Sequence, residues 1–62
     1  MVVKLYSKNN RLFGRYMSVK KITYKYNPIG EYTNVFLDTG EHTYHLTIYD
    51  AVKHEVDIQV EV

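Results

Sequence analysis

A chain of 62 residues with a net charge of +1 holds one small domain at most, because a chain of this size buries only about 60% of the surface that its unfolded form exposes. It contains no cysteine, which excludes disulfides and a cysteine nucleophile and leaves association as the natural supplement to a thin core. No apolar run approaches membrane-spanning length, and the polar stretch 7–10 ends the N-terminal apolar run before a signal peptide forms, so we expect a cytoplasmic protein.

The composition favours strands over helices. Seven tyrosines, two phenylalanines and many valines, isoleucines and threonines have high strand propensity, whereas Ala51 is the only alanine. A long helix is therefore not expected. Few alanines beside many lysines, tyrosines and asparagines are also typical of the AT-rich genomes of some bacteria and phages.

The first elements predicted in chain order are two strands, over residues 2–6 and 12–16. The segment 8–11 between them is typical of a tight turn, because its asparagines tolerate left-handed backbone conformations. The alternative is a short helix over residues 7–20, where several long side chains recur every four residues. Gly14 costs such a helix about 1 kcal/mol relative to alanine, so we favour a hairpin.

A third strand is predicted over residues 22–26, where large apolar side chains alternate with lysine and threonine. The segment 27–30 then marks a turn. Pro28 restrains Asn27 to an extended conformation, and Gly30 can close the turn. The pattern indicates a half-buried strand that leads into a hairpin.

The next two strands are predicted over residues 32–38 and 42–49, joined by a turn at residues 38–41. Gly40 readily supplies the positive φ that tight hairpins require. In the second strand, Tyr44, Leu46 and Ile48 share one side.

The register of this hairpin has two alternatives that the sequence leaves open. Either Val35 and Leu37 join the core face, or Tyr32 and Phe36 do. A slip of one residue inverts every side chain of a strand, and the loop length decides between the two.

The clearest pattern lies at residues 56–62, where valine and isoleucine alternate strictly with acidic residues and Gln59. Residues 50–54 before it are short enough for a hairpin loop or a single helical turn. We therefore predict a hairpin between the strands 42–49 and 56–62. It would place Tyr49 beside Glu55, Ile48 beside Val56, Leu46 beside Ile58 and Tyr44 beside Val60.

Together these elements predict an all-β fold for a single domain over residues 1–62. We expect a small antiparallel meander of five or six strands, closed into a barrel or a sandwich. A flat single sheet is the alternative, and it would need a second copy to cover its apolar face.

Charge is distributed unevenly along the chain. Residues 1–26 carry seven lysines and arginines and no acid, a charge of +7, whereas residues 27–62 carry seven acids against Lys53, a charge of −6. Three explanations compete. Basic and acidic strands pair within the fold, a basic edge of one copy meets an acidic edge of another, or the basic half binds nucleic acid.

Binding residues are sought in the basic half, where tyrosines are interleaved with the cations. Lysine and arginine neutralise phosphates while aromatic rings stack on bases, so such a surface suits single strands. The acidic half and the sequence pI of about 8.0 argue against this function. The candidate binding residues are Arg11, Arg15, Lys20, Lys21, Lys25, Tyr24 and Tyr26.

No motif predicts catalysis, a metal or a cofactor. His42 and His45 point to opposite faces of one predicted strand, and a pair of His45 with His54 across the predicted hairpin is the better metal candidate, although solvated surface histidines are the more common case. We therefore expect no metal, no cofactor and no enzymatic activity.

The leading hypothesis is a protein-interaction module that self-associates, as a homodimer, through a sheet edge or face, and that can also contact another protein. The alternative is a single-stranded nucleic-acid-binding protein.

Overall fold

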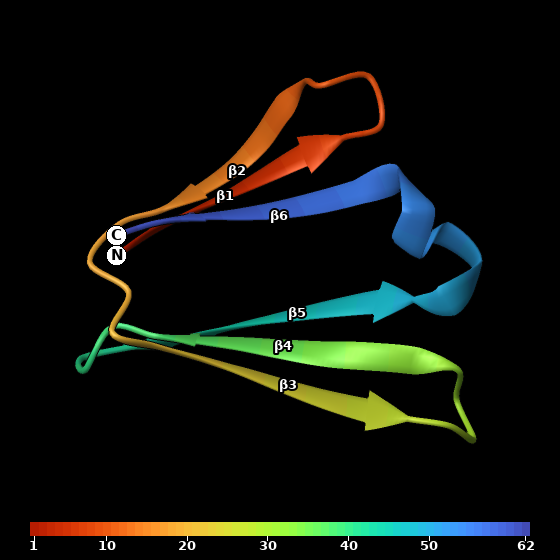
Figure 1. Cartoon of the computed structure of the whole chain (residues 1–62). Helices are drawn as coiled ribbons and strands as arrows, with labels where there is room; N and C mark the ends of the chain where they lie inside the picture. Colours follow the sequence, from red (N-terminus) through yellow and green to blue (C-terminus); the bar gives the residue numbers. More distant parts are fainter.

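The computed structural model describes all residues 1–62, and it contains six strands and one short 3-10 helix (Figure 1). All strand pairs are antiparallel, in two three-stranded sheets with the orders β2-β1-β6 and β3-β4-β5. The elements are β1 (Val2–Ser7), β2 (Leu12–Tyr16), β3 (Lys21–Asn27), β4 (Tyr32–Asp38), β5 (Thr43–Tyr49), η1 (Asp50–Glu55) and β6 (Val56–Glu61). The predicted all-β class is confirmed, and no closed barrel is found.

Strands β1 and β2 form the predicted N-terminal hairpin. Asn10 adopts a left-handed conformation with φ 59°, and its N–H donates to the Ser7 carbonyl at 2.9 Å. The Ser7 N–H donates in turn to the Arg11 carbonyl at 2.9 Å, which closes the turn. The prediction of a hairpin is confirmed, and the alternative of a helix over residues 7–20 is wrong.

Strands β3 and β4 form the second predicted hairpin, and Glu31 takes the left-handed position in its turn. The Gly30 N–H donates to the Asn27 side chain at 2.9 Å, whereas the positive φ of 54° belongs to Glu31. Gly30 is required for space, because an added Cβ would lie 2.1 Å from the Tyr32 ring.

The structure decides the register between β4 and β5. Val35 and Leu37 are fully buried, opposite Leu46 and Tyr44 respectively. The alternative with Tyr32 and Phe36 in the core is therefore wrong. As predicted, Gly40 in the connecting turn has a positive φ, of 93°.

The predicted hairpin between residues 42–49 and 56–62 is wrong. Strand β6 pairs with β1, where Ile58 lies opposite Leu5, and η1 carries the chain from one sheet to the other. The alternation predicted which side chains face inward, but β1 offers the same alternating apolar face as β5. Of the two alternatives for residues 50–54, a hairpin loop or a single helical turn, the structure has the helical turn, which is η1, and this element crosses between the layers.

The core lies between the two sheets. Val3, Val19, Val35 and Leu37 form its centre, and Leu46 and Ile58 are among the partly buried side chains that pack against it. Only five of the 62 residues are buried. The total accessible surface is 4611 Å², against about 4,200 Å² expected for a folded chain of 7.4 kDa. The core is therefore thin for the size of the chain.

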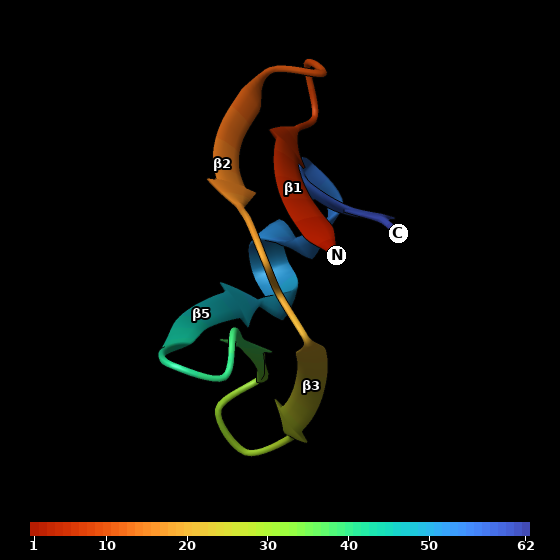
Figure 2. The ribbon, with the colours of Figure 1, turned by 90° about the vertical axis from the view of Figure 1, so that its left-hand side faces the viewer.

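The two sheets are stacked so that β2 lies over β5. The rings of Tyr16 in β2 and Tyr44 in β5 are in contact, with centroids 5.0 Å apart, so these two edge strands lie on the same flank of the molecule. The edge strands β3 and β6 consequently lie on the opposite flank (Figure 2). The six-residue η1 is the only helix, so no helix here is long enough to cross a membrane.

Candidate functional site

Polar and aromatic side chains gather on the outer face of the β3-β4-β5 sheet. Because Val35 and Leu37 point into the core, the alternate residues of β4 point to solvent. These are Asn34 and Phe36 in the middle of the strand, with Lys25 opposite Asn34 on β3. The register that buries two β4 side chains therefore creates this face.

An ordered aromatic cluster occupies the centre of this face. The Phe36 and His45 rings stack with centroids 4.7 Å apart and an interplanar angle of 9°. The Lys25 ammonium lies 5.8 Å from the Phe36 centroid, within reach of a cation–π interaction. Asn34 Oδ1 lies 2.9 Å from His45 Nε2, and it accepts a hydrogen bond from Thr47 Oγ1 at 3.0 Å.

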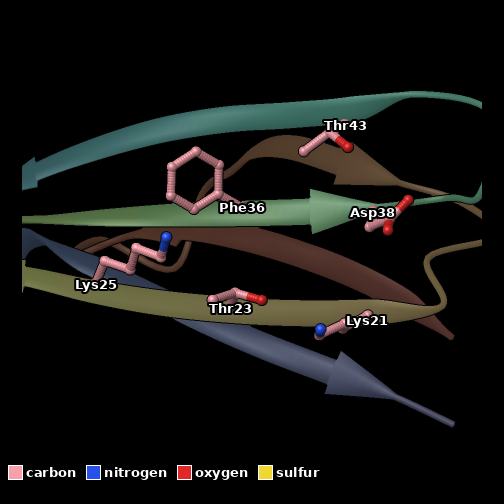
Figure 3. A pocket seen from close by; sticks show the side chains of 6 residues that line it. All are labelled: Lys21, Thr23, Lys25, Phe36, Asp38 and Thr43. Carbon is pink, nitrogen blue, oxygen red and sulfur yellow. The ribbon is translucent and has the colours of Figure 1, made fainter.

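A shallow, open hollow of about 210 Å³ lies beside this cluster. Figure 3 shows Lys25 reaching toward the Phe36 ring, with Lys21 and Asp38 at the other end. Two ammonium groups against one carboxylate suit an anionic ligand that carries a planar ring. The lining residues are Lys21, Thr23, Lys25, Phe36, Asp38 and Thr43.

The structure brings only part of the predicted binding set together. Lys21 and Lys25 lie on the outer face of β3, and Lys20 precedes them, with its N–H donating to the Asp38 carbonyl at 2.7 Å. Arg11 lies in the turn between β1 and β2, and Arg15 lies in β2, both in the other sheet.

Tyr24 and Tyr26 lie on the opposite side of β3 from the two lysines. Alternation places them on the face of Ile22, which packs against the core, yet each is 56% exposed because β3 is an edge strand. The Tyr26 hydroxyl donates to Asp50 Oδ2 at 2.6 Å. This hydrogen bond to a carboxylate raises the pKa of Tyr26 above its ordinary value.

Sequence reasoning missed Phe36, His45 and Asn34 as members of one surface. The available signal was the hairpin register, since a buried Val35 and Leu37 require Phe36 to face solvent. Because the sequence did not decide this register, the tyrosines of β3 were chosen as the aromatic partners, since they are nearest to the lysines in the sequence.

Two ion pairs reduce the charge separation within the fold. Lys4 pairs with Glu61 at 2.8 Å, and Lys8 pairs with Glu55 at 3.2 Å. Both connect the first hairpin to the β6 region. The remaining cations of residues 1–26 form no salt bridge, and they are Arg11, Arg15, Lys20, Lys21 and Lys25.

The histidines do not form a cluster. His45 lies on β5 and His54 lies in η1, and the hairpin that would have paired them is absent. No group of three histidine or acidic side chains is arranged to hold a metal ion.

A second surface lies on the flank formed by the edges of β3 and β6. Tyr24 and Tyr26 contribute exposed aromatic area to it, and Val60 is 43% exposed. The outward side chains of β3 include two lysines, and those of β6 include Asp57 and Glu61. The flank thus combines uncovered apolar area with one basic and one acidic edge.

Comparisons of this chain with protein family models, with curated proteins and with solved structures found no match.

Proposed function

We propose that this protein is a non-catalytic interaction module that self-associates, as a homodimer, through a sheet edge. The observation that carries the proposal is the imbalance between core and surface. Five residues are buried, whereas twelve large hydrophobic residues are exposed. A chain this small gains stability when a second copy covers such area. In this proposal the two layers form an open sandwich whose flanks are the contact regions.

The absence of a built reaction centre supports a binding function over catalysis. No polar or charged residue is buried, and the hollow beside Phe36 is open to solvent. Catalytic groups depend on water-excluded surroundings that shift their pKa values and fix their orientation. The cysteine-free composition fits a reducing compartment, and a cytoplasmic location is part of the proposal.

Sedimentation equilibrium over a range of protein concentrations tests the proposal. We expect a monomer–dimer equilibrium with a mass that approaches twice 7.4 kDa as concentration rises. A strict monomer at millimolar protein would refute self-association.

A second candidate function is the binding of single-stranded nucleic acid by the outer face of the β3-β4-β5 sheet. It is favoured by the stack of Phe36 on His45 with Lys25 beside it. Stacking on an aromatic platform contributes about 1–3 kcal/mol per base, and the lysines would neutralise phosphates.

A titration of a fluorescent oligonucleotide at several salt concentrations tests this second function. Salt-sensitive binding at micromolar protein is expected, and Phe36→Ala should weaken it by tenfold or more. The matched control is Phe13→Ala, which removes an exposed phenylalanine from the other sheet. Equal loss in both variants, or no binding by the original chain, would contradict the assignment.

A further inference from the structure

We infer that the dimer forms by antiparallel pairing of edge strand β3 of one copy with edge strand β6 of the other. A twofold axis parallel to the strands relates the two copies, so the dimer contains this contact two times. This inference rests on the proposed self-association and names its interface. The ligand is therefore a second copy of this chain.

The placement of the two edges makes a closed pair possible. Strands β3 and β6 lie on the same flank, one in each layer (Figure 2), and they run in opposite directions (Figure 1). A twofold axis along the strands, midway between the layers, exchanges the two layers. It brings β6 against the partner's β3 and β3 against the partner's β6 at the same time. The contact closes on itself, so it yields a dimer and not a filament.

The backbone groups of β3 are free in the required pattern. Directly after β4, the Thr39 N–H donates to the His42 carbonyl at 2.9 Å. The backbone N–H and C=O groups of odd-numbered β4 residues therefore point toward β5. The backbone groups of even-numbered β4 residues such as Asn34 then form hydrogen bonds with those of odd-numbered β3 residues such as Lys25. Tyr24 and its even-numbered neighbours consequently turn their N–H and C=O groups outward.

The backbone groups of β6 are free in the matching pattern. The Ser7 N–H donates to the Arg11 carbonyl at 2.9 Å. The backbone N–H and C=O groups of odd-numbered β1 residues therefore point toward β2. Even-numbered β1 residues such as Lys4 then bond to odd-numbered β6 residues such as Gln59. Ile58 and its even-numbered neighbours turn their backbone N–H and C=O groups outward. At both edges, therefore, the free backbone groups belong to even-numbered residues.

Side-chain charge selects one register among those that the backbone allows. With Ile58 opposite the partner's Tyr24, Asp57 lies opposite Lys25 and Glu61 lies opposite Lys21. A shift by two residues in either direction leaves at least one of these charges without its partner. The chosen register also places Val60 opposite Ile22 on the core side.

Other edge pairings are less favourable. Strand β3 carries two cations and no acid, and β6 carries two acids and no cation. Pairing of either strand with its own copy therefore sets like charges against each other. Within one chain, Lys21, Lys25 and Asp57 form no salt bridge. The dimer would pair Lys25 with Asp57, bring Lys21 to Glu61, which Lys4 of the same chain also contacts, and cover the exposed rings of Tyr24 and Tyr26.

Charge reversal at one contact gives a direct test. Lys25→Glu and Asp57→Lys each place two like-charge pairs in their own homodimer, so each should raise the dimer dissociation constant about tenfold. Mixing the two variants should restore the affinity, because the heterodimer has opposite charges at both contacts. Sedimentation equilibrium of each variant and of the equimolar mixture measures this.

Matched controls carry the same change in net charge at other places. Arg15→Glu alters the β2 edge and Glu41→Lys alters an exposed turn, and both should leave dimerisation unchanged. Far-ultraviolet circular dichroism establishes that each variant is folded. If the original chain dimerises but the mixture is no stronger than either variant alone, this interface is wrong while the proposed function stands. If the original chain is monomeric, both are wrong.

Discussion

At the scale of single residues, the turns depend on backbone conformations that L-amino acids adopt at some cost. Asn10, Ser18 and Glu31 have positive φ values of 59°, 57° and 54°. Asparagine visits this region readily because its short side chain bonds locally, whereas a glutamate has no such compensation. The Glu31 conformation is held by its carbonyl, which accepts a hydrogen bond from the Asp50 N–H at 2.9 Å.

Glu31→Gly should therefore stabilise the protein. Removing the Cβ relieves about 1 kcal/mol of strain, and the greater freedom of glycine in the unfolded chain returns about half of it, so we expect a net gain of about 0.5 kcal/mol. Urea denaturation measures the change. Glu41→Gly removes the same charge from a turn position without positive φ, and it should destabilise the protein by a similar amount. Destabilisation by both variants would contradict the strain argument.

The contact of Tyr26 with Asp50 makes the free energy of unfolding depend on pH in the alkaline range. The hydrogen bond to Asp50 raises the pKa of Tyr26 above 10.0 in the folded protein, so folding favours the protonated phenol. The resulting stabilisation is fully present below pH 10 and is lost as pH rises through the folded-state pKa. Tyr26→Phe should remove this part of the pH dependence of the free energy of unfolding.

The control for this measurement is Tyr24→Phe. Tyr24 is also 56% exposed, but its hydroxyl makes no hydrogen bond to a carboxylate. Its replacement should leave the alkaline loss of stability in place. An unchanged profile in Tyr26→Phe would show that the contact with Asp50 has no energetic effect.

At the scale of the elements, the assignment of β6 to the first sheet determines the architecture. The six residues of η1 span the distance between layers, which a tight hairpin loop would not do. As a result, β1 becomes a central strand and the ion pairs of Lys4 and Lys8 reach acids at the far end of the chain.

Engineered disulfides distinguish the two topologies in this cysteine-free chain. Ser7→Cys with Val56→Cys joins residues that are opposite each other in β1 and β6, so a bridge should form on oxidation. Tyr44→Cys with Val60→Cys joins a pair expected from the hairpin prediction, and these positions lie in different sheets. Thiol titration and mass spectrometry under dilute conditions should find the bridge in the first variant only. The reverse result would restore the hairpin.

At the scale of the whole molecule, surface area limits what the monomer achieves alone. With five buried residues, the chain has little apolar area to offset the loss of conformational entropy. The proposed dimerisation would link stability to concentration, because only the folded chain would form the interface.

The midpoint of thermal unfolding should therefore rise with protein concentration. For a 62-residue chain, we expect about 5 °C for each tenfold increase when unfolding and dissociation are coupled. Differential scanning calorimetry over a hundredfold range measures the shift. A constant midpoint would argue against a dimer that contributes to stability.

Local patterns were sufficient to predict much of the secondary structure. Alternation and turn signals located all six strand segments and the inward faces of Leu46 and Ile58. The asparagines of residues 8–11 and Gly40 identified two turns, because backbone preference and one-sided burial act on neighbouring residues. Of the candidate surface, Lys21 and Lys25 were among the predicted binding residues because they belong to the basic half of the chain.

Only the tertiary structure decided which strands are neighbours. A strand with one apolar face fits any other strand with the same alternation, so the sequence of β6 is compatible with both β5 and β1. Packing across the layers, with Tyr16 on Tyr44 and η1 between the sheets, removes this ambiguity. The same packing buries Val35 and Leu37, places the half-buried Phe36 on the outer face beside Lys25, and sets a basic and an acidic edge on one flank. These arrangements arise from contacts between residues distant in the chain, which local periodicity does not encode.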